Sequence, residues 1–492
     1  MVGQGLFAKT YGGSSADRGY SVIQTADGGY AVAGETYSFG AGGGWNDFFV
    51  LKLNPDGSVA WAKTYGGTSI EFATSIIQTT DGGYAVAGMT YTFSAGQYDP
   101  FVLKLNPDGS VAWTRVFGGI QNDEIWSITQ TTDGCYVVAG NTNSFPPTEI
   151  NFFVAKLNSN GSIAWVKTYD AGATDYAYSV VATTDGGCFV GGRRTGTAND
   201  FFVLKLNSDG SVAWGRIIGG PKSEEAYCMT RTTDGGCVLA GYTISFAVAD
   251  TYDIFVVKLN SDGSLAWAKV FGGPKWDGAE CITQTSDGGY AVGGFTYSFG
   301  AGNTDYLVLK LNPDGSLAWA RTFGGTGYEE PRSIVQTMDG GYVLTGPSGW
   351  DVLVLKLDQN GNYPGCVQDC SPVVGTPSPS ISSISTGANC SPNTSSPNPI
   401  VTSPTPVITN ICAPVYEYVE ERGLESGPPI TCLSVPGGLV FRSEADTDLR
   451  LYAPDGRLSY SGKLQKGENR ISLDQGVYLW TTRNHKGKAV VR

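Results

Sequence analysis

The chain has 492 residues, of which 69 are Gly, 12% are aromatic and only 16% are charged, a composition typical of a turn-rich, all-β protein with a large core. The formal net charge is -13, and because residues 366–492 contain 11 basic and 11 acidic residues, the first 365 positions keep 21 of the 32 basic and 34 of the 45 acidic residues. This acidic balance argues against nucleic-acid binding, and no apolar run approaches the length of a membrane span.

A unit of about fifty residues repeats seven times between the N-terminus and residue 365, which predicts a repeat architecture. Each unit contains a DGG-type turn, and these turns start at Asp27, Asp81, Asp133, Asp185, Asp234, Asp287 and Asp339. The seventh unit lacks its last segment, whereas the chain opens with an extra copy of that segment at residues 6–13. The two incomplete ends complement one another, as a closed ring requires.

Each repeat carries four short apolar runs separated by Asp-Gly turn signals, for example at residues 21–25, 30–34, 48–53 and 59–64. Four such strands form one blade of a β-propeller, and the non-alternating run at 48–51 is typical of a strand buried on both faces. We therefore predict an all-β fold in which residues 1–365 form a seven-bladed β-propeller closed by the N-terminal strand. The repeats also resemble those of uncharacterised secreted bacterial propellers rich in LNPDGS and DGGY.

Residues 366–432 change in character, because they are rich in Ser, Pro, Thr and Asn and are expected to act as an extended linker rather than to bury a core. Five cysteines lie in or beside this segment: Cys366, Cys370, Cys390, Cys412 and Cys432. The chain has a single His and no paired C-x-x-C sites, so disulfides in an oxidising compartment are a better interpretation than zinc. Five more cysteines lie in the propeller, where Cys228 and Cys281 share one repeat position and either a bridge or small buried thiols would fit.

Residues 433–492 read as four or five alternating strands with turns at 454–456 and 466–467, which predicts a small β-sandwich. The pieces at 451–457, 466–469, 476–479 and 487–492 resemble, in that order, the C-terminal sorting domain of type IX secretion substrates. That resemblance implies contact with a secretion machinery, export from a Bacteroidetes-like Gram-negative cell, and an extracellular or cell-surface location.

Strand order predicts that the uniform DGG and NPDGS turns share one end of the ring, while the loops of variable length share the other end, here called the variable face. Rigid scaffolds commonly carry binding residues on such loops. Eight aromatic residues are expected on this face as candidates for binding a glycan or protein surface. They are Tyr37, Trp45, Tyr91, Tyr98, Phe145, Tyr252, Tyr297 and Trp350.

Two acidic positions recur in the repeat. The first acid, four residues after each GG, is expected to ring the channel mouth and comprises Asp17, Glu71, Asp123, Asp175, Glu224, Asp277 and Glu329. This ring could hold a cation such as Ca²⁺ or cap backbone N–H groups, and the repetition favours the capping role. The second acid precedes the third strand, where we expect a hydrogen bond between blades, and comprises Asp47, Asp99, Asn151, Asp200, Asp253, Asp305 and Asp351.

The hairpin NPDGS-x-A-W distantly resembles the Asp-box of sialidases, but its Gly directly follows the acid and clustered arginines are missing. We interpret its Asp residues as turn formers and its Trp residues as core between blades, with Phe7 in the Trp position of the closing blade. The only His, His485, lies in the C-terminal region, which excludes His-based catalysis within the propeller. No cofactor is expected.

Three functions remain. The leading hypothesis is a non-enzymatic surface protein that adheres to glycans or proteins through the variable face. The alternatives are a self-assembling extracellular subunit that associates through its linker or C-terminal domain, and a carbohydrate-active enzyme that uses carboxylates alone.

Overall fold

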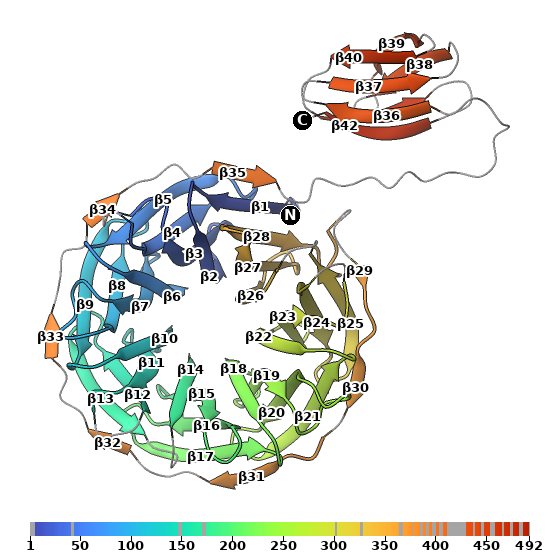
Figure 1. The fold of residues 1–492 in the computed structure, drawn as a ribbon. Coiled ribbons are helices and arrows are strands. Elements are labelled where there is room, and N and C mark those ends of the chain that lie inside the picture. Colours follow the sequence, from blue (N-terminus) through green and yellow to red (C-terminus); the bar gives the residue numbers. More distant parts are fainter. Residues whose placement is uncertain are drawn as a thin grey trace. The chain divides into compact units, whose positions relative to one another are not determined.

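The computed structural model shows a ring of sheets and a separate C-terminal unit (Figure 1). The residues that it describes are 5–40, 44–145, 150–169, 174–300, 303–324, 328–363, 368–375, 377–383, 387–389, 393–395, 400–402, 407–410, 430–435, 438–443, 447–452, 458–464, 467–472, 476–481 and 486–491. Every regular element in this part of the chain is a β-strand, and it contains no helix with the length and apolar character of a membrane span.

Seven radial sheets surround a central axis, which confirms the predicted seven-bladed propeller. Blades 1 to 3 contain β2 (Asp17–Gln24), β3 (Tyr30–Thr36), β4 (Asp47–Leu53), β5 (Val59–Gly66), β6 (Glu71–Gln78), β7 (Tyr84–Thr90), β8 (Asp99–Leu105), β9 (Val111–Gly118), β10 (Asp123–Gln130), β11 (Tyr136–Thr142), β12 (Asn151–Leu157) and β13 (Ile163–Tyr169). Blades 4 to 6 contain β14 (Asp175–Ala182), β15 (Cys188–Arg194), β16 (Asp200–Leu206), β17 (Val212–Gly219), β18 (Glu224–Arg231), β19 (Cys237–Thr243), β20 (Asp253–Leu259), β21 (Leu265–Gly272), β22 (Asp277–Gln284), β23 (Tyr290–Thr296), β24 (Asp305–Leu311) and β25 (Leu317–Phe323). Four consecutive antiparallel strands therefore form the body of each of these blades.

Blade 7 combines both ends of the propeller sequence, as the incomplete repeats predict. Its strands are β26 (Ser333–Gln336), β27 (Tyr342–Ser348), β28 (Asp351–Leu357) and β1 (Phe7–Gly12). The N-terminal strand β1 lies antiparallel to β28, with Tyr11 opposite Val352. The Val22 backbone N–H of β2 also donates to the Ser333 hydroxyl of β26 at 3.2 Å, so blades 7 and 1 are joined at the inner strands as well.

The core lies in the two middle strands of the blades. Every residue of β3 and β4 is buried, as the non-alternating sequence predicts for a strand covered on both faces. Aromatic rings link one blade to the next, and the Phe48 and Phe101 ring centroids lie 5.1 Å apart. Burial of such side chains is the main source of stability in a fold of this kind.

Short strands of the Ser/Pro/Thr-rich segment form a belt around the propeller, and the belt is defined here as the described residues between 368 and 410. It contributes one short strand to the outer edge of each blade (Figure 1). The belt strands are β29 (Gln368–Asp369), β30 (Val373–Gly375), β31 (Ser380–Ser383), β32 (Gly387–Asn389), β33 (Asn393–Ser395), β34 (Ile400–Thr402) and β35 (Val407–Asn410). They pair in turn with blades 6, 5, 4, 3, 2, 1 and 7, so the belt passes once around the ring in the reverse of chain order.

The belt changes two expectations from the sequence. Each blade has five strands rather than four, and the compact unit extends through the segment expected to be a linker, to Cys412. The physical reason is that an outer strand offers unpaired backbone groups, which even a Ser- and Pro-rich segment can satisfy without burying apolar side chains. Val373 and Val374 in β30 remain 52% and 44% exposed while their backbone pairs with β21.

The second unit spans Ala413–Arg492 and contains two antiparallel sheets. One sheet has the order β36-β37-β40 and the other β39-β38-β41-β42. The strands are β36 (Ile430–Val435), β37 (Gly438–Ser443), β38 (Thr447–Tyr452), β39 (Leu458–Leu464), β40 (Gly467–Ser472), β41 (Gly476–Thr481) and β42 (Lys486–Val491). The sequence predicts four or five strands in this region, whereas the part of it that the structure describes has seven, arranged as two small antiparallel sheets.

Candidate functional site

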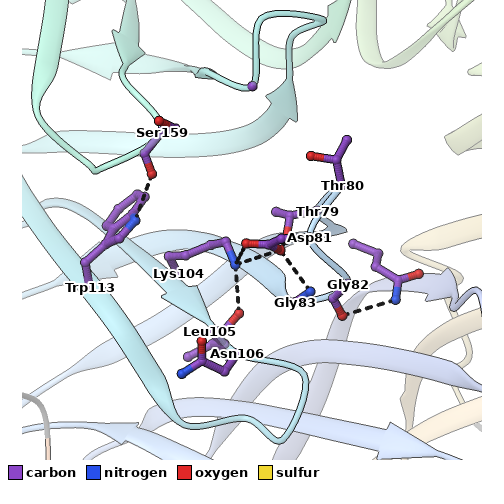
Figure 2. Close-up of polar contacts among 12 residues, drawn as sticks. Thr79, Thr80, Asp81, Gly82, Gly83, Lys104, Leu105, Asn106, Trp113 and Ser159 are labelled. Carbon is purple, nitrogen blue, oxygen red and sulfur yellow. Dashed lines mark hydrogen bonds and ion pairs between the residues drawn. The ribbon is translucent and has the colours of Figure 1, made fainter.

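The uniform end of the ring is built from a repeated ion pair, shown for blade 2 in Figure 2. The Lys104 ammonium lies 2.9 Å from the Asp81 carboxylate and donates to the Leu105 carbonyl at 3.0 Å. Equivalent Lys–Asp pairs occur in all seven blades. Burial acts to raise the pKa of Asp81, but hydrogen bonds from Thr79 and Lys104 outweigh it and lower this pKa to about 2. Identical contacts in every blade indicate a structural role.

The Trp of each NPDGS hairpin joins neighbouring blades, as the sequence predicts. The Trp113 indole N–H donates to the Ser159 carbonyl of the next blade at 3.1 Å (Figure 2). A side chain on Gly109, in the turn of blade 2, would collide with the Trp61 ring of blade 1. Phe7 covers Gly57 in the same way, so it takes the Trp position of the closing blade.

The first-acid ring lies beneath the variable face rather than open at the channel mouth. Six of its seven members are at most 1% exposed, and Glu329 is half-buried. Backbone N–H groups of the preceding GG segments donate to these carboxylates, as between Gly67 and Glu71 at 2.8 Å. The Thr90 hydroxyl also donates to Glu71 at 2.8 Å. These contacts correspond to the capping role, and among the described residues no three acidic, Cys or His side chains gather in a way that could hold a metal ion.

In five blades the second acid lies beside the first acid of the next blade. The Asp99 Oδ1 and Asp123 Oδ2 atoms lie 2.1 Å and 2.9 Å from the point where a Cβ on Gly118 would stand, so they are at most 5.0 Å apart. Burial, together with the Asp123 carboxylate, raises the pKa of Asp99 to about 6. Burial and Asp277 raise the pKa of Asp253 to the same value. Two buried carboxylates at this separation repel each other unless one is neutral.

Blade 3 indicates how this repulsion is relieved. There the second-acid position is occupied by Asn151, and the Asp175 backbone N–H of blade 4 donates to the carbonyl of the preceding residue, Ile150, at 3.0 Å. An asparagine amide is a neutral hydrogen-bond donor of nearly the same shape as a protonated aspartic acid. The substitution is therefore consistent with a proton shared within each acid pair, and not with a site that requires two negative charges.

The eight predicted aromatic residues divide by exposure. Tyr37, Trp45, Tyr91 and Trp350 are exposed, whereas Tyr98, Phe145, Tyr252 and Tyr297 are half-buried. The Tyr91 and Tyr98 rings contact each other on blade 2, with centroids 5.6 Å apart. Some of the eight predicted residues therefore contact other aromatic rings, as Tyr91 and Tyr98 do.

The largest group, here called the aromatic arc, contains two predicted residues and three that the sequence analysis missed. Its members are Tyr227, Tyr242, Tyr252, Trp276 and Tyr297, from blades 5 and 6. Successive centroids lie 5.7, 4.6, 5.2 and 6.2 Å apart. Trp276 is 52% exposed, so the arc reaches from the channel to the solvent at the variable face.

The channel wall is where the sevenfold repeat breaks down. A β-bulge in the inner strand of blades 1 to 6 turns one residue out of the ladder, immediately before a conserved small residue of the repeat. The residues at this position are Tyr20, Thr74, Trp126, Tyr178, Tyr227, Glu280 and, in blade 7, Arg332. They line a cavity of about 600 Å³ in the channel. The sequence did contain a signal for these cavity residues, because their position varies in residue type within a repeat that is otherwise uniform.

Three charged clusters lie at this cavity or next to residues that line it: Arg332 and Glu280 line it directly, and the hydroxyl groups of the lining residues Tyr20 and Tyr227 donate to Glu35 and Glu225. Arg18 pairs with Glu35 at 2.8 Å, and Arg193 pairs with Glu225 at 2.6 Å. In the third cluster, Arg332 bridges Glu280 and Glu330 at 2.9 and 2.8 Å. Burial raises the pKa of Glu280 to about 7, although Arg332 opposes the shift. The cavity therefore combines aromatic rings with charged groups that can orient a polar ligand.

The predicted linker cysteines are only partly visible. Cys370 is half-buried and packs against the core between blades 5 and 6. Cys366, Cys390 and Cys412 lie outside the described residues, and Cys432 belongs to β36. In the propeller, Cys228 and Cys281 are free thiols that line the channel cavity. The disulfide assignment for the belt stays a prediction.

Comparison with known proteins supports the architecture. A family model described as a domain of unknown function (DUF5122) beta-propeller matches residues 25–59, 79–111 and 285–317, which fall in blades 1, 2 and 6. The chain is a β-propeller protein. Over 169 residues, 32% of this chain, it is 28% identical to the regulatory protein FlaEY of Caulobacter vibrioides, and the match spans 17% of FlaEY.

Solved structures that are similar to this chain have low sequence identity and TM-scores below 0.5. Sqt1 from Chaetomium thermophilum is 11% identical with a TM-score of 0.41, and the alignment covers 73% of this chain and 86% of Sqt1. PorZ, a surface component of the type IX secretion system of Porphyromonas gingivalis, is 13% identical with a TM-score of 0.38, over 95% of this chain and 58% of PorZ.

Proposed function

We propose that this protein is a non-enzymatic, secreted or cell-surface adhesion protein that binds glycans through the variable face of its propeller. The aromatic arc carries the proposal. Aromatic faces stack on the C–H faces of sugar rings, while nearby amide N–H groups donate hydrogen bonds to sugar hydroxyl groups and nearby carboxylates accept hydrogen bonds from them. The arc provides such a surface beside the Arg193–Glu225 pair, to which Asn199 donates at 2.6 Å.

The first experiment is a glycan-array measurement on the full chain and on Trp276→Ala. We expect the wild-type protein to bind a defined set of glycans, and the variant to lose about tenfold or more in affinity, because a central aromatic anchor commonly dominates such an interface. Ile120→Ala is the matched control, because Ile120 is a 73% exposed apolar residue on the same face but outside the arc. It should bind as the wild type does.

Other results of this experiment would contradict the proposal. If the Trp276 variant bound glycans as tightly as the wild type, the aromatic arc would not be part of the binding site. Release of reducing sugar ends would favour the carbohydrate-active enzyme, for which Glu280 and Glu330 beside Arg332 are the carboxylates to change. Regular filaments of the purified protein in electron micrographs, without glycan binding, would favour the self-assembling subunit.

We also propose that the C-terminal unit directs export by a type IX machinery to the outer surface of a Gram-negative cell. The motif order at residues 451–492 and its arrangement as two small antiparallel sheets support this assignment. Expression of the chain in a type IX-competent host should place the propeller outside the cell, whereas a chain ending at residue 412 should stay inside. Equal export of both forms, assayed by protease accessibility of the propeller, would contradict the assignment.

A further inference from the structure

The channel cavity differs in chemistry from the aromatic arc above it. Three consecutive blades place aromatic rings on its wall, and the next blade places a carboxylate there. The Trp126 and Tyr178 centroids lie 5.9 Å apart, and those of Tyr178 and Tyr227 lie 5.3 Å apart. Glu280 of blade 6 follows at the equivalent position and lines the same cavity. The wall is therefore a curved aromatic surface that ends in an acid.

The charges around this cavity are unequal. Glu280 and Glu330 share a single guanidinium group, that of Arg332. Glu124 adds a further carboxylate on the inner strand of blade 3, where the Asn141 side chain donates to it at 3.5 Å. The pairs Arg18–Glu35 and Arg193–Glu225 are balanced, so the group as a whole has more carboxylates than guanidinium groups.

An excess of negative charge beside the faces of aromatic rings favours an organic cation. The ring quadrupole attracts an ammonium group over the ring face, and a partly buried carboxylate provides its counter-charge. A neutral sugar would gain the ring contact but not this charge complementarity. A carboxylated sugar would meet repulsion from Glu280 and Glu330.

We propose that the channel cavity binds the ammonium group of an amino sugar, between the rings of Trp126, Tyr178 and Tyr227 and the carboxylate of Glu280. The inference rests on the proposed glycan-binding function and specifies the class of sugar. The aromatic arc then holds the neighbouring sugar rings, because Tyr227 belongs to both the arc and the cavity wall. A glycan chain with a free amine at or near one end fits this arrangement.

The test compares glucosamine oligosaccharides with their N-acetylated counterparts of equal length, by calorimetric titration of the full chain. We expect the free-amine series to bind at least tenfold more tightly at pH 7, where about half of the Glu280 carboxyl groups are already ionised before the amine binds. Tyr178→Ala and Glu280→Gln should each remove most of that difference, whereas Met338→Ala, a change at an exposed residue on the uniform face, should preserve it. Equal affinity for the two series in the wild-type protein would overturn the proposal.

A second measurement needs no substitution in the site. The Cys228 thiol is half-buried and lines the cavity, so its reaction with methyl methanethiosulfonate, followed by peptide mass spectrometry, reports whether the cavity is occupied. The glucosamine oligosaccharide should slow modification of Cys228 several-fold and leave Cys135, outside the cavity, unaffected. Unchanged modification of Cys228 at a saturating concentration would place the amine elsewhere.

These outcomes separate the two proposals. Binding of neutral glycans that depends on Trp276 but shows no amine preference would keep the proposed function and refute the channel inference. An absence of binding to any glycan would refute both.

Discussion

Asp99→Asn and Asp253→Asn are each expected to stabilise the propeller at pH 8 and to leave its stability near pH 4 almost unchanged. In the folded protein both carboxyl groups have a pKa of about 6, above the usual value of 3.8, because they are buried beside a second carboxylate. A raised pKa favours the folded state at low pH, and this contribution is lost as the pH rises through 6. The loss at pH 8 is on the order of 2 to 3 kcal/mol per site.

The asparagine variants keep a neutral donor at the position at every pH, as Asn151 does in blade 3. Chemical unfolding of the wild type and each variant between pH 4 and pH 8 measures the effect. The gain in the free energy of unfolding should develop between pH 4 and 6, the interval between the unfolded and folded pKa values, and then level off. Destabilisation of Asp99→Asn that appears only in the presence of Ca²⁺ would instead support a cation between the paired acids.

Asp81→Asn serves as a control for Asp99→Asn, because its expected effect on stability at pH 7 has the opposite sign. The folded-state pKa of Asp81 is lowered to about 2, so its contribution to stability is present above 3.8 and lost as the pH falls through 2. At pH 7 this substitution should destabilise the protein, because it leaves the buried Lys104 ammonium without its partner. Opposite signs for Asp99→Asn and Asp81→Asn at pH 7 would separate the roles of the two repeated acids.

The second large effect concerns the belt. A chain that ends at residue 363 should still form the seven-bladed ring, but it should unfold at least tenfold faster than a chain that ends at residue 412. Without the belt, β1 loses β35 and keeps only β28, so the strand that closes the ring is held on one edge instead of two. The outer edges of all seven blades also lose their backbone partners.

Both chains lack the C-terminal unit, so the comparison isolates the belt. Unfolding in denaturant, followed by tryptophan fluorescence, gives the rates, and light scattering reports self-association through the freed edges. The shorter chain should associate as its concentration rises. Equal unfolding rates and equal masses for the two chains would show that the belt does not hold the ring closed.

The sequence was sufficient to predict the propeller, because each DGG turn marks a hairpin and the displaced segment at residues 6–13 specifies how the ring closes. It did not reveal the belt, because strands that bind through backbone groups need no apolar pattern. In the structure the belt strands after β29 start at residues 373, 380, 387, 393, 400 and 407, a spacing of six or seven residues that accompanies the step from blade to blade.

The candidate site was predicted only in part, for a different reason. Tyr252 and Tyr297 could be placed on the variable face from strand order alone. Tyr178 and Tyr227 could not be placed on the channel wall, because that position depends on a bulge at which one residue leaves the ladder. The repeated acids were located correctly within the repeat, but their burial and their pairing across blades depend on the packing of neighbouring sheets.

Blade 7 has a consequence for the order in which this protein can fold during synthesis. Its five strands come from the beginning of the chain, from residues 333–357 and from residues 407–410. The ribosome must therefore synthesise the six other blades after Phe7–Gly12 and before the rest of blade 7. Until then this strand has no neighbouring strand in its sheet, and the sheet cannot assemble. Contacts between such distant positions close slowly, because the intervening loop has to be ordered first. Folding should thus end at blade 7, with the earliest-synthesised strand of the propeller among the last to become ordered.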